Sequence, residues 1–394
     1  MFDLHRRLVL YSVHQEWDPL KTCILGRSYP PEFYGWIQQP HVRDLFERIA
    51  RETEEDYQAI QQKLEEFGIQ VLRPRAMNVS FDFSKGSPFP PPMVPRDIMV
   101  MIGQTLYTSW YIGDRSHHTN FSSAYKAVRD PLWPDCASWE EFNQLPSGIR
   151  DECINLHGFD QIKMMDPVWQ YEHIVNDIRQ QGNQIQQTYP WLNGAMCSKI
   201  GRDLYFGTRN YNDNVQLIQE QAVAQFPDYR NHVINTGGHS DGTYCPVCPG
   251  LIFSLRDVPT YADTYPGWEV IYLQNQGWDG LPEWRDLKLK NNGKWWIPGF
   301  ERDNDVIDLV ENWLGHWMGY VEETVFDINM LVLDQKNVLV LGYNELVWRT
   351  LERYGITAHV VPFRHRYFWD GGLHCITADL DRPGPRLDFF PDRS

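Results

Sequence analysis

The chain has 394 residues, of which 42% are hydrophobic and 22% charged, and its 36 basic and 52 acidic side chains give a net charge of −16. The 16 Trp, 20 Tyr and 19 Phe residues supply enough apolar surface for a core, which excludes a wholly disordered chain. The negative charge makes nucleic acid and anionic membranes poor general partners, whereas it suits a cationic small molecule.

Targeting signals are absent from the sequence. No run approaches the ~20 apolar residues that a membrane-spanning helix needs, and residues 1–17 lack the apolar core and cleavage site of a signal peptide. Seven cysteines spread over so long a chain are typical of reduced thiols. We therefore expect a cytoplasmic protein, and a homodimer is one assembly that the sequence allows.

Strand and helix signals alternate in the first part of the chain. Short apolar runs predict strands, a 3.6-residue apolar period predicts a helix, and a proline-rich run excludes both helix and central strand. In chain order they predict a strand at 22–28, a helix at 50–67 ended by Gly68, a strand at 69–73, a loop at 87–95 and a hairpin at 98–107 turning at Gly103–Gln104.

The same succession of hairpin, helix and strand recurs further along. It is predicted as a hairpin at 198–207 before a helix at 213–226, and as a hairpin at 328–343 before a helix that ends near Tyr354 and a strand at 356–363. Such a module, repeated without close sequence repetition, predicts a propeller-like or pseudo-symmetric α/β fold. Residues 108–180, rich in Trp, Asp and Pro, break the succession and are predicted to be an insertion.

Cys375 is the first candidate for chemistry. It follows two glycines, which allow a ligand to approach the backbone closely, and it opens an alternating, strand-like run, GGLHCITADL at 371–380. A free cysteine is more often a small buried apolar residue than a nucleophile, so this segment alone leaves both interpretations open.

His239 and Asp241 form a second candidate. They lie two residues apart, so on an extended segment both side chains would project to one face as an acid/base pair. A structural histidine in a loop is the alternative. Cys245 and Cys248 suggest zinc, but no second cysteine pair or histidine pair stands at a suitable spacing, so we disfavour a metal there.

Two further carboxylate sites stand out. Asp97 lies between the proline-rich loop and an apolar strand, where a buried carboxylate must have a partner. That partner is either a protein guanidinium, with Arg96 as the candidate, or the guanidinium of a substrate. Glu322 and Glu323 precede the hairpin at 328–343, and adjacent carboxylates of this kind are usually a solvated loop face.

Six segments, in order, resemble the glycine amidinotransferase family. They are EWDPLKTCILGR (16–27), PRDIMVMIGQTLY (95–107), GRDLYF (201–206), GHSDGTYCPVCPG (238–250), NMLVLDQKNVLV (329–340) and GGLHCITADLDRPG (371–384). The resemblance implies a single catalytic domain over 1–394 with the pentein fold, a five-bladed α/β propeller of pseudo-fivefold ββαβ modules. It also implies transfer of the amidino group of arginine to an amine, with ornithine released and no metal or organic cofactor.

The resemblance assigns roles to individual residues. It places the nucleophile at Cys375, the general acid and base at His239, and the carboxylates that hold arginine at Asp97 and Asp241. These types suit the chemistry, because a resonance-stabilised guanidinium must be oriented by carboxylates, attacked by a thiolate and relieved of its amine by an acid. An Arg for the substrate carboxylate falls near Arg256.

Two positions depart from the family pattern. The family's Asp partner of the catalytic histidine falls near Asn193, and a neutral partner would make that histidine less basic. A substrate-contacting Ser pair falls on Glu322 and Glu323, and the extra negative charge predicts a diamine or basic amino acid as acceptor in place of glycine.

Two other functions remain open at this stage. In an arginine deiminase-like hydrolase, water would take the place of the acceptor amine and ammonia would appear in place of ornithine. In a non-catalytic binder of guanidino compounds, the pocket would remain without turnover.

Overall fold

The computed structural model describes most of the chain. The described residues are 10–75, 92–109, 169–188, 192, 194–208, 215–237, 239–255, 261–273, 297, 299–300, 302–310, 326–369 and 371–393. Among the sequence predictions, Asn193, Arg256, Glu322, Glu323 and residues 110–168 of the predicted insertion lie outside these ranges.

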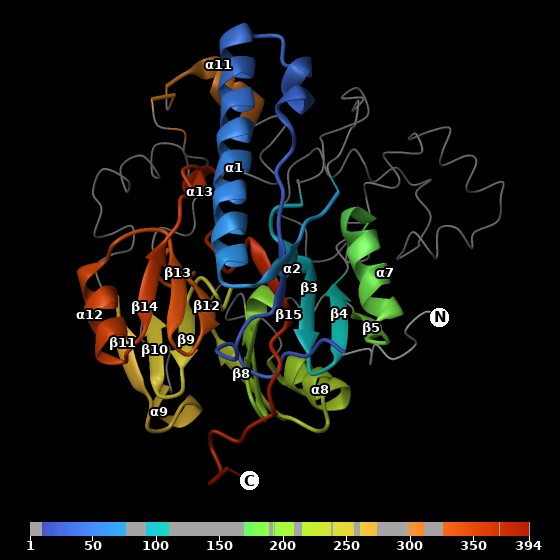
Figure 1. Ribbon diagram of the computed structural model, residues 1–394, viewed down its shortest axis with the longest axis vertical. Coiled ribbons are helices and arrows are strands. Elements are labelled where there is room, and N and C mark those ends of the chain that lie inside the picture. Colours follow the sequence, from blue (N-terminus) through green and yellow to red (C-terminus); the bar gives the residue numbers. More distant parts are fainter. Residues whose placement is uncertain are drawn as a thin grey trace, which may run out of the picture.

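The protein is an α/β structure, and its described residues form five three-stranded mixed sheets (Figure 1). The first sheet contains β15 (Thr377–Asp381), β1 (Thr22–Leu25) and β2 (Gln70–Leu72). The second contains β3 (Met99–Ile102), β4 (Thr105–Ser109) and β5 (Gln184–Thr188), and the third β6 (Cys197–Ile200), β7 (Asp203–Thr208) and β8 (Arg230–Asn235). The fourth contains β9 (Tyr244–Cys248), β10 (Leu251–Ser254) and β11 (Glu269–Tyr272), and the fifth β12 (Leu331–Asp334), β13 (Asn337–Val340) and β14 (Thr357–Val360).

The five sheets share one pairing pattern. In each, the central strand is antiparallel to one neighbour and parallel to the other. The parallel strand follows the central strand in sequence after at least one helix, as a parallel connection requires. These helices are α1 (Pro40–Glu66), α7 (Glu172–Gln180), α8 (Val215–Gln225), α9 (Tyr261–Thr264) and α12 (Glu345–Arg353).

The repeated succession predicted from the sequence is confirmed as local structure. Hairpins form at β3–β4, β6–β7 and β12–β13, and the first two turn at Gly103 (φ 57°) and Gly201 (φ 64°), where glycine adopts a left-handed backbone at little cost. The first sheet differs, because β15 from the C-terminal end pairs with β1 from the N-terminal end.

Two predicted boundaries were wrong. Helix α1 begins at Pro40, ten residues before the predicted start, and its buried face already includes Val42 and Phe46; it ends as predicted before Gly68 (φ 73°). Pro95, predicted to lie in a loop, is the first residue of the short helix α2 (Pro95–Ile98), where a missing N–H costs nothing.

Helix α1 has 27 residues and rises beyond the sheets (Figure 1). One face packs into an apolar cluster with Leu331 and Phe363, while acidic and basic side chains cover the other. None of the described helices combines the length and the apolar character that crossing a bilayer requires.

The N-terminal segment connects three sheets. Val13 forms a bridge with Gly103 in the β3–β4 turn and another with Arg382 after β15, and Gln15 forms a bridge with Ile200 of β6. This segment therefore delivers Glu16 into the interior, where the side chain is buried.

Gly26 sets how closely the segment before α2 approaches the first sheet. A Cβ atom at Gly26 would lie 2.0 Å from the carbonyl oxygen of Met93, and the Gly26 N–H donates to the carbonyl of Ile376. The segments leading to Asp97 and to Cys375 thus meet at a position without room for a side chain.

We predict that Gly26→Ala lowers the free energy of unfolding by about 2 kcal/mol, because backbone atoms must move to admit the methyl group. Gly35→Ala is the control, since nothing lies within 4 Å of a Cβ there, and it should change stability by less than about 0.5 kcal/mol. Urea titrations of the two variants test this. Equal stability of both would contradict the close approach.

Candidate active site

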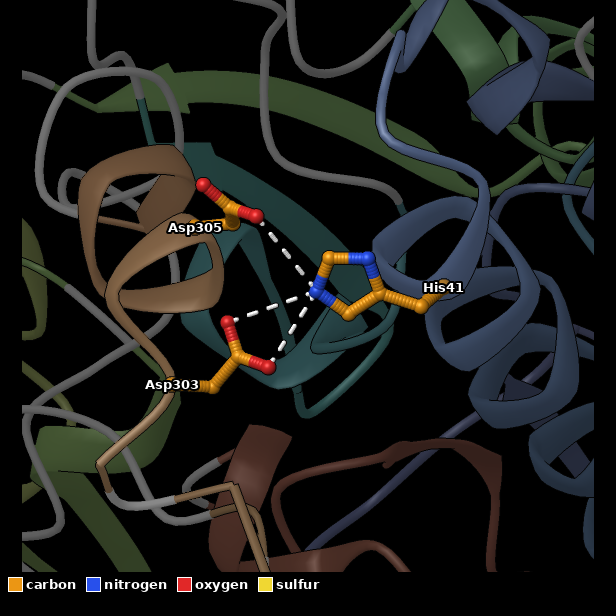
Figure 2. Close-up of side chains that lie close together, drawn as sticks. All are labelled: His41, Asp303 and Asp305. Atoms are coloured by element: carbon orange, nitrogen blue, oxygen red, sulfur yellow. Dashed lines mark hydrogen bonds and ion pairs between the residues drawn. The ribbon is translucent and has the colours of Figure 1, made fainter.

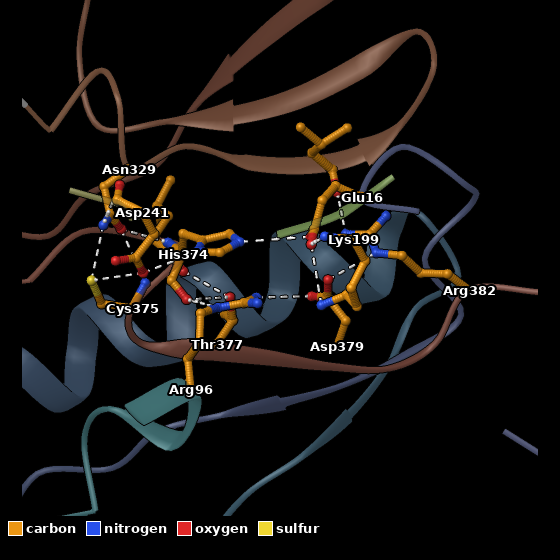
Figure 3. Close-up of polar contacts among 12 residues, drawn as sticks. Glu16, Arg96, Lys199, Asp241, Asn329, His374, Cys375, Thr377, Asp379 and Arg382 are labelled. Carbon is orange, nitrogen blue, oxygen red and sulfur yellow. Dashed lines mark hydrogen bonds and ion pairs between the residues drawn. The ribbon is translucent and has the colours of Figure 1, made fainter. Parts of the chain in front are cut away.

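Cys375 lies in the turn between Leu373 and Thr377 that leads into β15, and it is 3% exposed. Its Sγ accepts a hydrogen bond from Nδ2 of Asn329 at 2.9 Å, and its thiol donates to Oδ2 of Asp241 at 3.4 Å (Figure 3). The thiol is thus fixed by polar groups from two other segments, unlike a cysteine that only fills apolar space.

The other described cysteines have apolar surroundings. Burial raises the pKa of Cys23 and Cys197 to about 12 and that of Cys248 to about 11, so these thiols stay protonated at neutral pH. Cys245 and Cys248 lie on β9 opposite Phe253 and Leu251 of β10, with a register irregularity between them, and both belong to one apolar cluster.

Asp241 is a buried carboxylate with a specific partner. Its Oδ2 lies 3.0 Å from Nδ1 of His374. Burial by itself would raise the pKa of Asp241, but the hydrogen bond and charge of His374, helped by His239 and Arg96, outweigh it and hold the pKa below its ordinary value. The carboxylate therefore stays ionised, and its buried Oδ1 accepts no hydrogen bond from the described residues.

His239 interacts electrostatically with this carboxylate and also lies near Asp97. Nδ1 of His239 is 4.0 Å from Oδ1 of Asp97, and both side chains are partly exposed. The predicted arrangement of His239 and Asp241 on one face of an extended segment was wrong, because Ser240 and Asp241 begin a turn closed by Thr243. The turn directs Asp241 to His374 and leaves His239 near Asp97.

Arg96 forms its ion pair with Asp379 and not with its neighbour Asp97. Its Nη2 lies 3.1 Å from Oδ1 of Asp379 on β15, and its Nε donates to the carbonyl of His374 at 2.7 Å. Burial would lower the pKa of Arg96, but Asp379 and Glu16 raise it. Arg96 thus holds the backbone beside Cys375. Of the two kinds of partner that the sequence left open for Asp97, the side chain of Arg96 is therefore not the one.

A second buried ion pair, between Glu16 and Lys199, lies on the other side of His374 from Asp241. Oε1 of Glu16 is 3.1 Å from Nζ of Lys199, and its Oε2 is 3.8 Å from Nε2 of His374. Burial would raise the pKa of Glu16, but the charge of Lys199 and the hydrogen bond of His374 hold it well below its ordinary value. His374 is therefore placed between two carboxylates, Glu16 and Asp241.

Arg382 completes the buried network. Its Nε lies 3.0 Å from Oδ2 of Asp379, and its two Nη atoms donate to the carbonyls of Asp18 and Val332. Three carboxylates and three cations are then buried together, which satisfies the requirement that buried charges be paired. They are Glu16, Asp241, Asp379, Arg96, Lys199 and Arg382.

A small cavity lies beside this network. It has a volume of about 20 Å³, enough for about one water molecule, and its walls include Glu16, Asp241, Tyr244 and His374. Cys375 is not among the residues that line it.

Sequence reasoning missed several of these residues. All four lie inside segments that carry the family resemblance, and the first three are single polar residues between apolar ones: Asn329, His374, Asp379 and Arg382. That pattern is a usable signal for buried polar networks. Their partners could not be read from it, since Asn329 and Cys375 are 46 residues apart in sequence.

One group in the described part of the chain has metal-ligand geometry. Nε2 of His41, in the first turn of α1, lies 3.2 Å from Asp303 and 3.5 Å from Asp305, at the start of α11 (Asn304–Leu309) (Figure 2). Asp303 also caps α11 by accepting the N–H of Val306. Because all three are partly exposed, ion pairing between the two helices accounts for the arrangement.

Comparison with known proteins shows that the chain is similar to amidinotransferases. The glycine amidinotransferase of Xenopus tropicalis mitochondria is 23% identical over 412 residues, covering 96% of this chain and 84% of the relative. Inosamine-phosphate amidinotransferase 1 of Streptomyces glaucescens is 22% identical, covering 95% and 97%. The chain is a homologue of the amidinotransferases.

The solved structures agree at the level of the fold. SxtG, an amidinotransferase of Microseira wollei, aligns with a TM-score of 0.59 and 16% identity over 96% of this chain and 99% of its own. The inosamine-phosphate amidinotransferase of Streptomyces griseus aligns equally well. No protein-family model matches this amidinotransferase homologue.

We predict that Glu16→Gln destabilises the protein by about 3 kcal/mol at neutral pH, because it removes the carboxylate that neutralises the buried Lys199. The folded-state pKa of Glu16 is lowered, so its contribution is present above its ordinary pKa of about 4.5 and is lost as the pH falls. The deficit should therefore shrink in acid.

Urea titrations at pH 7 and pH 4 test this prediction. Glu345→Gln removes a carboxylate from an exposed pair with Arg349 and is the matched control, with an expected cost below about 0.5 kcal/mol. A Glu16→Gln deficit as small as the control's would mean that the buried pair does not matter to the fold.

Proposed function

We propose that this protein is an amidinotransferase that moves the amidino group of L-arginine to an acceptor amine through an amidino-cysteine at Cys375. The observation that carries the proposal is the polar fixing of the Cys375 thiol beside the buried, ionised Asp241. Homology to amidinotransferases along nearly the whole chain supports the same reaction class.

Asp241 and Asp97 would hold the guanidinium. Oδ1 of Asp241 is buried and accepts no hydrogen bond from the described residues, so it suits a substrate N–H. His239 lies beside Asp97, where it would reach the departing nitrogen. Arg256 is our candidate for the substrate carboxylate and Asn193 for the partner of His239.

In the first half-reaction, the Cys375 thiolate attacks the guanidinium carbon. The C–S bond forms while electrons of a C=N bond move to nitrogen. The C–N bond to the side chain then breaks as His239 donates a proton to that nitrogen, and ornithine leaves. The amidino group remains on Sγ.

In the second half-reaction, the acceptor amine attacks the same carbon. His239, now neutral, takes a proton from the amine. The new C–N bond forms, and the C–S bond breaks with its electron pair returning to Sγ. The described groups supply the nucleophile, the acid and the base, so the scheme requires no cofactor.

We also propose that the five sheets are the blades of a pentein-type propeller that forms one catalytic domain over the whole chain. Their common pairing pattern and the closure of the first sheet by the two ends of the chain support this arrangement. A chain closed in this way would bring the loops before β12 and β15 to one central site.

The covalent intermediate can be tested by intact-protein mass spectrometry after a brief incubation with arginine. We expect an amidino adduct with equimolar ornithine on the wild type and on Cys248→Ala, and none on Cys375→Ala. Ammonia and citrulline in place of ornithine would assign a deiminase. Arginine binding without any adduct would assign a binding protein.

The acceptor can be identified by supplying amines to the loaded enzyme. We expect diamines or basic amino acids to discharge the adduct at least tenfold faster than glycine, because Glu322 and Glu323 add negative charge where the family has a Ser pair. Glu323→Ser should narrow this difference. Use of glycine with diamines ignored would refute the acceptor assignment.

A further inference from the structure

Asn329 is wholly buried, and both ends of its amide face the cysteine turn. Its Oδ1 accepts the backbone N–H groups of His374 at 2.8 Å and Cys375 at 3.0 Å. Its Nδ2 donates to the Cys375 Sγ at 2.9 Å and to the Asp241 carbonyl at 3.2 Å (Figure 3). One side chain therefore holds the nucleophile's backbone and touches its sulfur.

The surrounding structure leaves this amide little freedom. A Cβ atom at Gly372 would lie 2.6 Å from Cβ of Asn329, so the turn packs directly on the side chain. The backbone carbonyl of Asn329 also accepts the His374 N–H at 3.2 Å. Oδ1 is used by two N–H groups, and this fixes the amide orientation with its NH₂ end toward the sulfur.

We propose that Asn329 is a catalytic residue that stabilises the Cys375 thiolate by donating an N–H to it, beyond its support of the turn. Asp241 lies 3.4 Å from the same sulfur and repels a thiolate, so a donor on Sγ is needed to offset that carboxylate. The same N–H stabilises the sulfur when it becomes the leaving group in the second half-reaction.

This inference rests on the proposed function for its part in turnover, but the thiolate itself can be examined without substrate. The probe is the rate of alkylation of Cys375 by iodoacetamide at neutral pH, followed by peptide mass spectrometry. The variants are Asn329→Asp, which keeps the acceptor for both backbone N–H groups and loses the donor, and Asn329→Ala, which loses the donor without adding charge. Asn176→Asp on α7 is the control for added charge.

We expect alkylation to slow by at least about tenfold in both Asn329 variants, as for the loss of a hydrogen bond to a charged group, and to be unchanged in Asn176→Asp. Asn329→Asp should keep a melting temperature near the wild type. If one of the two Asn329 variants folds poorly, the alkylation rate of the other, well-folded variant is compared with that of the wild type. Alkylation within twofold of the wild type would overturn the proposal and leave Asn329 with a structural role alone.

Measuring arginine turnover then separates the proposed function from the proposed role of Asn329. We expect kcat to fall in Asn329→Asp while KM for arginine stays within about twofold, since both ends of the amide are already used by the cysteine turn and Asp241. If the wild type does not convert arginine but alkylation still depends on Asn329, the proposed function fails and the role of the amide stands. If arginine is converted but the alkylation rate does not depend on Asn329, the proposed function stands and the proposed role of the amide fails.

Discussion

Burial of charge beneath the cysteine turn is the constraint on which the site depends. Glu16, Asp379 and Asp241 are ionised in the interior, and each would be expelled or neutralised without a matched partner. The charged residues of this network come from segments far apart in sequence. The N-terminal segment, α2, β6 and the segment around β15 each supply at least one of them. The ion pairs therefore connect segments that apolar packing would not place with the same accuracy.

The buried carboxylates of the network differ in their partners. Asp379 is occupied by Arg96 and Arg382, and Glu16 by Lys199, so both serve the structure. Asp241 uses Oδ2 for His374 and Cys375, and its Oδ1 accepts no hydrogen bond from the described residues. A scaffold that neutralises its own cations internally can thus present a negatively charged oxygen beside a thiol, which suits a cationic guanidinium more than an anionic or neutral substrate.

The first sheet links this chemistry to chain connectivity. It joins β1, near the beginning, to β15, near the end, and Cys375 lies just before β15. Gly26 follows β1 and meets both Met93 and Ile376, so the segments that carry Asp97 and Cys375 approach through one glycine. The pairing of β1 with β15 is therefore part of how the candidate site is assembled.

The sequence by itself determined the local elements and the similarity to amidinotransferases. Apolar periods and turn glycines predicted the hairpins at Gly103 and Gly201, and ordered motifs indicated an amidinotransferase homologue, because such signals are contained within short segments. Only the tertiary structure decided the partners. Arg96 turned to Asp379 in place of its neighbour Asp97, and His374 and Asn329 became contacts of Asp241 and Cys375. Pairing between buried polar groups depends on which segments meet in space, and no local pattern records that.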